Sequence, residues 1–322
     1  ALLLAGPASG DSLVTQTIPL TSGWNAVFLE VTPETNGVLA VFDGVPIDSV
    51  WTFIHEGQGV EFIQDVSEEL VDDPFWLVFF PTNRIEAKFN DLARIVGDTP
   101  YFIKLAAGTS YTWNVTGRPA VPRYDWNPEY FNLVGFFINP VPPRPTAANF
   151  FAHAPALNGQ AIYRLDANGV WQLVASPAST QLKEGEAIWV FAGGETDYMG
   201  PLHVTIDQNA GMDFGGSLDE LSVNLENRSM TNSTTVTIED LTPGGAEFSY
   251  WTFDTNVDEV VWLDLPDPLT VTIATGVTHR IRLSVNRDAI SGDSYDTILQ
   301  VISDTGMRVR LPVHARKELS GP

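Results

Sequence analysis

Residues 23–33 read GWNAVFLEVTP, and residues 130–140 read YFNLVGFFINP. Both stretches carry asparagine at their third position, continue through apolar residues and end in proline, so the second is a diverged copy of the first. Four further matches follow in the same order along the chain: 40–42 with 149–151, 50–51 with 162–163, 59–63 with 169–173, and 97–103 with 184–190. Five matches in one order indicate a duplicated module.

The residues that recur between the two copies are aromatic and β-branched residues beside turn glycines, which strands and hairpins need. Acidic, histidine and hydroxyl side chains hardly recur. The duplication therefore concerns a scaffold, and it shows no active site. Short helices are expected at residues 36–42, 86–95 and 146–153. Elsewhere, alternating patterns and short apolar runs predict an all-β, mostly antiparallel protein.

The same patterns predict three β-rich domains. Copy one spans residues 12–117, a proline-flanked linker spans 118–123, and copy two spans 124–204. Because the linker is short and large apolar residues follow it, we expect the two copies to pack together. Eight candidate strands at hairpin-like spacing predict an immunoglobulin-like β-sandwich over residues 205–317: 221–225, 235–238, 248–253, 260–263, 270–273, 279–285, 295–301 and 307–313.

Copy one is longer than copy two, and we place its insertion at about residues 65–90. This region contains the apolar run DDPFWLVFFP (72–81). The interpretation we favour is an extra buried strand, and the alternative is an exposed apolar edge for a partner.

Two parts of the chain resemble bacterial proteins. The stretches LSVNLENRSM (221–230), TTVTIE (234–239) and HRIRLSVNRD (279–288) make residues 214–315 similar to bacterial immunoglobulin-like domains, including the BACON type. The stretches GWNAVFLEVTPE, YFIKLAAGTSYTWNVTGRP and RYDWNPEYFNLVGF resemble the N-terminal region of large secreted bacterial surface proteins. The resemblance implies a β-sandwich and an extracellular or cell-surface location, and it assigns no site residue.

Composition excludes several function classes. The chain has 40 acidic and 17 basic residues, a formal net charge of −23, so it repels nucleic acid and anionic membranes. It has no cysteine, which excludes disulfides and thiolate metal sites. The opening ALLLAGPASG is expected to be the end of a secretory signal, and the alternative is an apolar arm over residues 1–11 that packs on a neighbour. No other stretch is apolar for long enough to be a transmembrane segment.

No pattern of residues predicts catalysis. The five histidines lack metal-binding spacing, and adjacent acids lie in polar, turn-like segments. No cofactor is expected, except that calcium suits the oxygen-rich loops of an acidic exported protein. Its candidate ligands are Asp288, Asp293 and Asp296. The DANG sequence at residues 166–169 is a weaker candidate, because it is typical of a hairpin turn.

The nine tryptophans raise a second kind of site. Exposed tryptophans on a β-sandwich can stack on sugar rings. Trp113, Trp126, Trp171 and Trp251 have polar neighbours, which predicts partial exposure. The remaining tryptophans stand in apolar runs and are expected in the core.

We therefore expect a non-enzymatic extracellular structural protein: a surface-layer, adhesive or filament-forming subunit. Such a subunit would self-associate or bind other surface proteins by pairing strand edges or terminal strands. The candidate assembly residues are Leu2, Leu3, Leu4, Val14, Ile18 and Leu20. The alternative is a carbohydrate-binding protein that holds a polysaccharide on exposed aromatics. An enzyme comes third, and it would need a deep cleft with two carboxylates or a metal.

Overall fold

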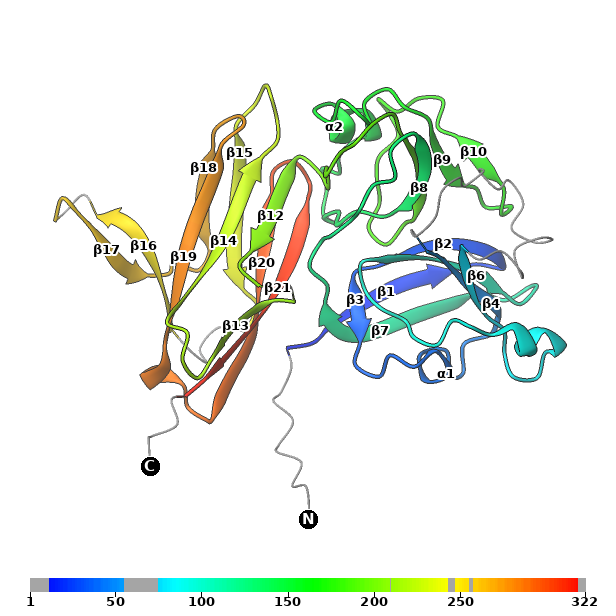
Figure 1. The fold of residues 1–322 in the computed structure, drawn as a ribbon, viewed down its shortest axis with the longest axis horizontal. Helices are drawn as coiled ribbons and strands as arrows, with labels where there is room; N and C mark the ends of the chain where they lie inside the picture. The colour runs from blue at the N-terminus through cyan, green and yellow to red at the C-terminus, as the bar shows by residue number, and fades with distance from the viewer. Residues whose placement is uncertain (1–11, 55–74, 209, 243–246, 255–256, 318–322) are drawn as a thin grey trace, which may run out of the picture. The chain divides into compact units, whose positions relative to one another are not determined.

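The computed structural model describes residues 12–54, 75–208, 210–242, 247–254 and 257–317. The chain forms two compact units, of which one comprises Val14–Gly200 and the other begins at Pro201 (Figure 1). Strands make up nearly all the regular structure of these residues, and most of them pair antiparallel. The all-β fold expected from the sequence is confirmed.

Copy one is a two-layer sandwich. Its larger sheet has the order β2 (Gly23–Leu29), β6 (Thr99–Leu105), β4 (Ile47–Phe53) and β5 (Trp76–Phe79). Its smaller sheet has the order β1 (Val14–Leu20), β7 (Tyr111–Pro119) and β3 (Val31–Pro33). Ile18 and Trp113 from the smaller sheet meet Leu29 and Ile103 from the larger sheet in one buried core. The connections contain helix α1 (Val38–Val41) and the 3₁₀ helix η2 (Ile85–Phe89), which is shorter than the helix expected at residues 86–95.

Copy two repeats the larger sheet of copy one. Its order is β8 (Tyr130–Val134), β11 (Ile188–Ala192), β9 (Ile162–Leu165) and β10 (Trp171–Leu173), with helix α2 (Ala147–Phe151) where the sequence predicts it. The register is also repeated, because Asn25 pairs with Ile103 and its counterpart Asn132 pairs with Val190, the counterpart of Ile103. The duplication seen in the sequence is therefore present in the fold.

The fourth strand of each sheet corrects the sequence alignment. Trp76 on β5 pairs with Phe53, as Trp171 on β10 pairs with Leu165, so Trp76 holds the position of Trp171. Residues 59–63, which the sequence matched with 169–173, lie outside the described residues, as do residues 72–74. The run around Trp76 is a buried strand, as favoured. It is not an extra strand, however, because β10 holds the same place in copy two. The additional residues of copy one precede this strand, between β4 and β5.

The segments that lead into β6 and β11 hold the two short helices in the same way. In copy one, Val38 N donates to Ala93 O (3.1 Å) and Ile95 N donates to Asn36 O (2.8 Å). In copy two, Ala147 N donates to Thr180 O (2.8 Å) and Leu182 N donates to Pro145 O (2.9 Å). These four bonds join counterpart positions of the duplicated sequence, so the repeat extends beyond the strands.

The asparagine shared by GWN and YFN forms hydrogen bonds with the turn that precedes its strand. Asn25 Oδ1 accepts from Thr21 N (2.8 Å), and its amide donates to the carbonyls of Thr21 and Gly23. Asn132 Oδ1 accepts from Asn127 N (2.8 Å), and its amide donates to the carbonyls of Asn127 and Tyr130. Because each side chain uses both its carbonyl and its amide to hold this turn, both asparagines are structural.

The larger sheets of the two copies pack face to face through aromatic rings. The contacts are reciprocal: Trp76 meets Trp189 with ring centroids 6.4 Å apart, and Phe102 meets Trp171 at 5.3 Å. Trp76 and Trp171 are counterparts, as are Phe102 and Trp189. The expected packing of the two copies is therefore observed.

One further pair of counterparts meets at this interface. Phe28 lies against Gly135, which occupies the same position in copy two, and a Cβ added to Gly135 would stand 1.9 Å from Phe28 Cγ. Close packing here requires a large residue in one copy and no side chain in the other.

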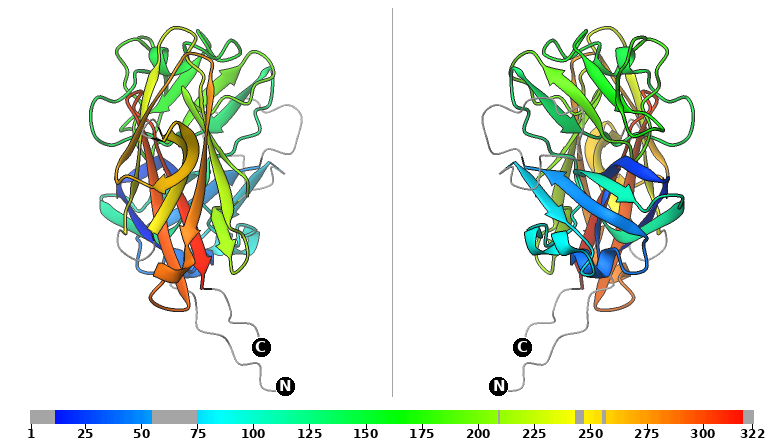
Figure 2. Two further views of the ribbon diagram at one scale, coloured as in Figure 1. Left: turned by 90° about the vertical axis from the view of Figure 1, so that its left-hand side faces the viewer. Right: turned by 90° about the vertical axis from the view of Figure 1, so that its right-hand side faces the viewer.

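The second unit is a sandwich of two five-stranded sheets (Figures 1 and 2). One sheet has the order β12 (Leu202–Ile206), β14 (Glu220–Asn227), β19 (Thr278–Asn286), β16 (Glu247–Asp254) and β17 (Glu259–Asp264). The other has the order β13 (Met212–Gly215), β21 (Arg308–Arg316), β20 (Ser294–Ser303), β15 (Thr234–Asp240) and β18 (Leu269–Ile273). The eight expected strands are all present, and β12 and β13 are additional. Because β12 pairs with β14, residues 202–204 belong to the sandwich and not to copy two.

Candidate functional site

The β16–β17 hairpin extends beyond the strand that supports it. β16 pairs with β19 only from Glu247 to Tyr250, whereas it pairs with β17 as far as Asp254. The outer half of the hairpin is therefore a two-stranded ribbon, and Figure 1 shows it projecting from the sandwich. A ribbon of two strands is marginally stable by itself in water.

Four apolar side chains lie together on one face of this ribbon. Trp251 pairs with Trp262, and Phe253 pairs with Val260, so strand alternation directs all four side chains to the same side. Their exposed fractions are 38% for Trp251, 54% for Phe253, 47% for Val260 and 37% for Trp262. We call these four residues the hairpin face.

An arginine on β19 borders the hairpin face. The guanidinium of Arg282 lies 4.7 Å from the ring centroid of Trp251 and 5.8 Å from that of Trp262. Both nitrogens of its fork bind the carboxylate of Glu220, with Nη2 2.6 Å from Oε2. This hydrogen bonding lowers the pKa of Glu220 and raises the pKa of Arg282, so both remain charged at neutral pH. Arg282 therefore packs against the two indoles, and the carboxylate of Glu220 balances its positive charge.

The edge strand β17 is apolar in its middle and acidic at its ends. Val260, Trp262 and Leu263 are exposed, and Glu259 and Asp264 flank them. β17 is the last strand of its sheet, so among the described residues one side of its backbone has no strand neighbour. Natural edge strands usually carry bulges, prolines or inward charges that prevent pairing with another chain, and the middle of β17 carries none of them.

Three of the four tryptophans expected to be exposed are buried. Trp113 stacks on Phe42 at 4.9 Å, Trp126 Nε1 donates to Tyr198 O (2.9 Å), and Trp171 belongs to the aromatic interface of the two copies. Their exposed fractions are 7% or less, so they cannot stack on a sugar ring. Of the four, only Trp251 is exposed. Trp262, which stands in an apolar run and was expected in the core, is its partner on the hairpin face.

The three candidate calcium ligands do not form a site in the described residues. Asp288 lies in the 3₁₀ helix η3 (Arg287–Ala289), and Asp293 lies in the exposed loop that follows. Asp296 is on β20, where its Oδ1 is 2.6 Å from His314 Nδ1. Over these residues no three histidine or acidic side chains gather in a way that could hold a metal ion.

The candidate assembly residues are not brought together as a free strand. Leu2, Leu3 and Leu4 lie outside the described residues. β1 pairs with β7 along its whole length, from Val14 opposite Gly117 to Leu20 opposite Tyr111. Ile18 and Leu20 are buried in the core of copy one, so their side chains are unavailable to a neighbour.

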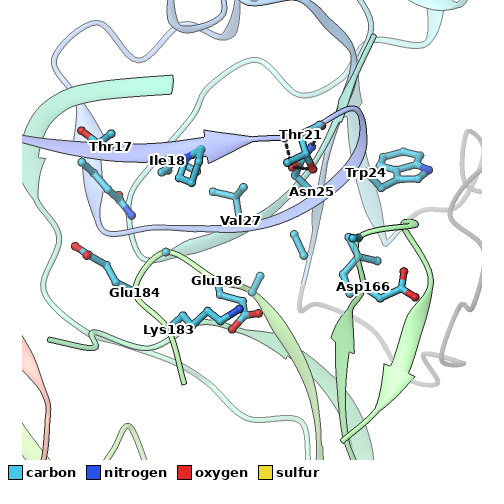
Figure 3. Close-up of a pocket in the computed structure, with 17 residues that line it drawn as sticks. Thr17, Ile18, Thr21, Trp24, Asn25, Val27, Asp166, Lys183, Glu184 and Glu186 are labelled. Carbon is cyan, nitrogen blue, oxygen red and sulfur yellow. Dashed lines mark hydrogen bonds between the residues drawn. The ribbon is translucent and has the colours of Figure 1, made fainter. Parts of the chain in front are cut away.

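A cleft of about 310 Å³ lies where the two copies meet (Figure 3). Its lining comes from β1 and β2 of copy one, and from the 165–167 and 183–187 segments of copy two. This volume is at the lower end of the range of small-molecule sites, about 300 to 1,000 Å³.

The described carboxylates of the cleft do not converge. Figure 3 shows Glu184 near one end, Asp166 at the other, and Glu186 beside Lys183 between them. Asp166 accepts from the backbone N–H groups of Val170 and Asn168, which lowers its pKa and closes the β9–β10 turn. Glu186 is 2.5 Å from Arg164 Nη2, and burial raises its pKa despite that partner. Asp166 and Glu186 therefore act within the fold, and the DANG stretch is the hairpin turn that its sequence predicts.

No protein-family model and no curated protein matches the chain. Among solved structures, it is similar to PapD-like domain 7 of human CEP192, at 11% identity and a TM-score of 0.25, over 38% of this chain and 87% of that one. It is also similar to the collagen-binding subdomain of the Enterococcus faecalis surface protein ACE, at 8% identity and a TM-score of 0.21, over 38% and 99%. A third likeness is to Escherichia coli alpha-2-macroglobulin activated by porcine elastase, at 9% identity and a TM-score of 0.23, over 95% of this chain and 33% of that one. At these scores the likenesses assign no function. Among the described residues no helix is long and apolar enough to cross a membrane.

Proposed function

We propose that the protein is a non-enzymatic extracellular adhesive protein that binds its partner through the hairpin face. The observation that supports this most directly is the grouping of four exposed apolar side chains on one side of a projecting ribbon. Single exposed apolar residues are ordinary on a soluble protein, whereas grouped ones mark binding surfaces. Tryptophan, phenylalanine and arginine are also the residue types enriched at the centres of protein interfaces.

The extracellular location rests on the sequence. The resemblance to large secreted bacterial surface proteins supports it. An acidic surface keeps such a protein dispersed until a specific contact forms.

Two details of the hairpin face favour a protein partner over a polysaccharide. The rings of Trp251 and Trp262 are inclined at 64° to each other, so they form no single flat platform for a sugar ring. The guanidinium of Arg282 also lies over both indoles and occupies part of the area that a sugar would need. The exposed backbone edge beside these rings can instead pair with a polypeptide.

The test is binding to arrays that carry extracellular proteins and polysaccharides, with purified recombinant protein. The variant Trp251→Thr/Phe253→Thr keeps strand-forming residues but removes half of the apolar face. The control is Val170→Thr/Leu173→Thr, which replaces two exposed apolar residues of copy two with threonine. We expect binding to protein spots that falls at least about tenfold in the hairpin variant and is unchanged in the control.

Two results would contradict the proposal. The first is equal binding by the hairpin variant and the wild-type protein, with circular dichroism showing both folded. The second is binding confined to polysaccharide spots, which would support the carbohydrate-binding alternative. Oligomers that depend on the hairpin face would assign this face to a surface layer or filament.

A further inference from the structure

The outward side of β17 offers alternate backbone groups to another strand. Leu265 N, which directly follows β17, donates to Phe248 O (2.7 Å) toward β16. In an antiparallel pair, the backbone groups of successive residues point alternately toward and away from the neighbouring strand. The N–H and C=O groups of Val260, Trp262 and Asp264 therefore point away from β16. An added strand would also convert the marginal two-stranded ribbon into a three-stranded sheet.

The side chains of β17 restrict what such a strand can be. Its middle, Val260 to Leu263, is apolar on both faces of the ribbon, so an added strand must have apolar or β-branched residues there. Its ends carry Glu259 and Asp264, both exposed, and Asp258 and Asp267 lie just beyond them. Arg282, the base beside the ribbon, is held by Glu220 and does not neutralise these acids.

A second copy of the same strand fits this edge poorly. In an antiparallel pair, residues whose backbone groups point outward face one another, so β17 can pair with a second β17 only around Val261 or around Trp262. The first register places Asp264 of each strand opposite Asp258 of the other, and the second places Asp264 opposite the apolar Val260. Like charges directly opposite one another destabilise a strand pair. The net charge of −23 adds a repulsion between whole molecules.

We propose that β17 is the docking edge for an extended polypeptide segment of a partner protein, with lysine or arginine at both ends and apolar or β-branched residues between. This inference rests on the proposed adhesive function and names its partner. The basic ends pair with the acidic ends of β17, the middle packs on the hairpin face, and the two backbones form one continuous sheet.

The first test uses two synthetic peptides and the recombinant protein in calorimetric titrations. One peptide is Lys-Lys-Val-Thr-Val-Thr-Val-Lys-Lys, blocked at both ends, and the other replaces each lysine with glutamate. We expect the lysine peptide to bind at least about tenfold more tightly, and this difference to shrink in high salt. The double charge reversal Glu259→Lys/Asp264→Lys should reverse the preference. Equal binding of the two peptides, or an unchanged preference in the reversed variant, would overturn the inference.

The second test separates backbone pairing from side-chain contact. Val260→Pro removes an outward N–H without removing a bond to β16, because proline is tolerated on an edge strand where its nitrogen faces solvent. Val260→Thr is the matched control, since it keeps the N–H and changes only the side chain. We expect Val260→Pro to lose lysine-peptide binding at least about tenfold and Val260→Thr to lose much less.

The outcomes also distinguish this inference from the proposed function. If Val260→Pro binds as tightly as Val260→Thr while Trp251→Thr/Phe253→Thr has lost its array binding, the adhesive function stands and strand pairing is wrong. A concentration-dependent dimer that Val260→Pro abolishes would show a second copy on this edge. Both of these results would overturn the inference.

Discussion

Gly135→Ala tests the packing of the two copies at a single atom. The added Cβ would stand 1.9 Å from Cγ of Phe28 and 2.2 Å from its Cβ, far inside van der Waals contact. Phe28 is buried, with 2% of its surface exposed, so its ring has no open space into which it can move. The backbone of Gly135 is not left-handed, so the cost is steric. Overpacking of this kind costs about 1–3 kcal/mol of unfolding free energy, and we expect about 3 because the contact is so close.

The reciprocal change supplies the other side of a double-mutant cycle. Phe28→Ala should cost about 3–5 kcal/mol, because it leaves a cavity in the interface. The space it vacates is where the methyl group of Gly135→Ala would go. The double variant should therefore be more stable than the sum of the two single losses predicts, by about 2 kcal/mol.

Urea unfolding followed by tryptophan fluorescence measures all four proteins. A background with Trp251→Phe and Trp262→Phe removes the tryptophans of the sandwich unit, so the remaining emission comes from Val14–Gly200 alone. Additive losses within about 0.5 kcal/mol would refute the reasoning, because residues out of contact show no greater coupling.

Two further predictions concern buried polar groups of the same unit. Asn132→Ala should lower the unfolding free energy by about 3 kcal/mol and Asn25→Ala by about 1–2 kcal/mol. The reason is that Asn132 is fully buried, whereas water can reach part of Asn25. Equal losses in the same urea titrations would contradict this order. Burial raises the pKa of Tyr101 to about 12, so its contribution to stability is present below its ordinary pKa of 10.0 and is lost as pH rises through about 12. Alkaline titration of tyrosinate absorbance should show a late step that Tyr101→Phe removes, and an unchanged curve in that variant would refute the assignment.

The sequence predicts the scaffold well because the scaffold depends on local patterns. The eight strands of the sandwich and both α-helices follow from alternation, turn residues and the repeated motif. The alignment fails at β5, because Gly59-Val60 resembles Gly169-Val170 more closely than anything near Trp76 does. Only the pairing of β5 with β4 shows which segment completes the sheet.

The exposure of tryptophans was predicted less well, because it depends on the opposing surface. Trp171 has polar neighbours and lies on a short hairpin, which is typical of an exposed residue, but the sheet of copy one covers it. Trp262 stands in an apolar run, which is typical of a core, but its strand is the last of the sheet and projects beyond β19. Local sequence carries neither fact, so the hairpin face could not be found from it.

The parallel pairing of β13 with β21 has a mechanical consequence for the sandwich unit. β21 is the last strand of the sandwich unit and β13 is its second, after β12, and Met212 opposite Val313 and Asp213 opposite His314 align β13 and β21 in the same direction. Once β12 has separated from β14, tension that enters β13 at its beginning and β21 at its end pulls these two strands lengthwise past each other. The hydrogen bonds between β13 and β21 are then loaded in shear and must break together. In an antiparallel pair pulled from the same end, the hydrogen bonds would break one at a time. The order of the strands therefore suits the sandwich to bearing load along the chain.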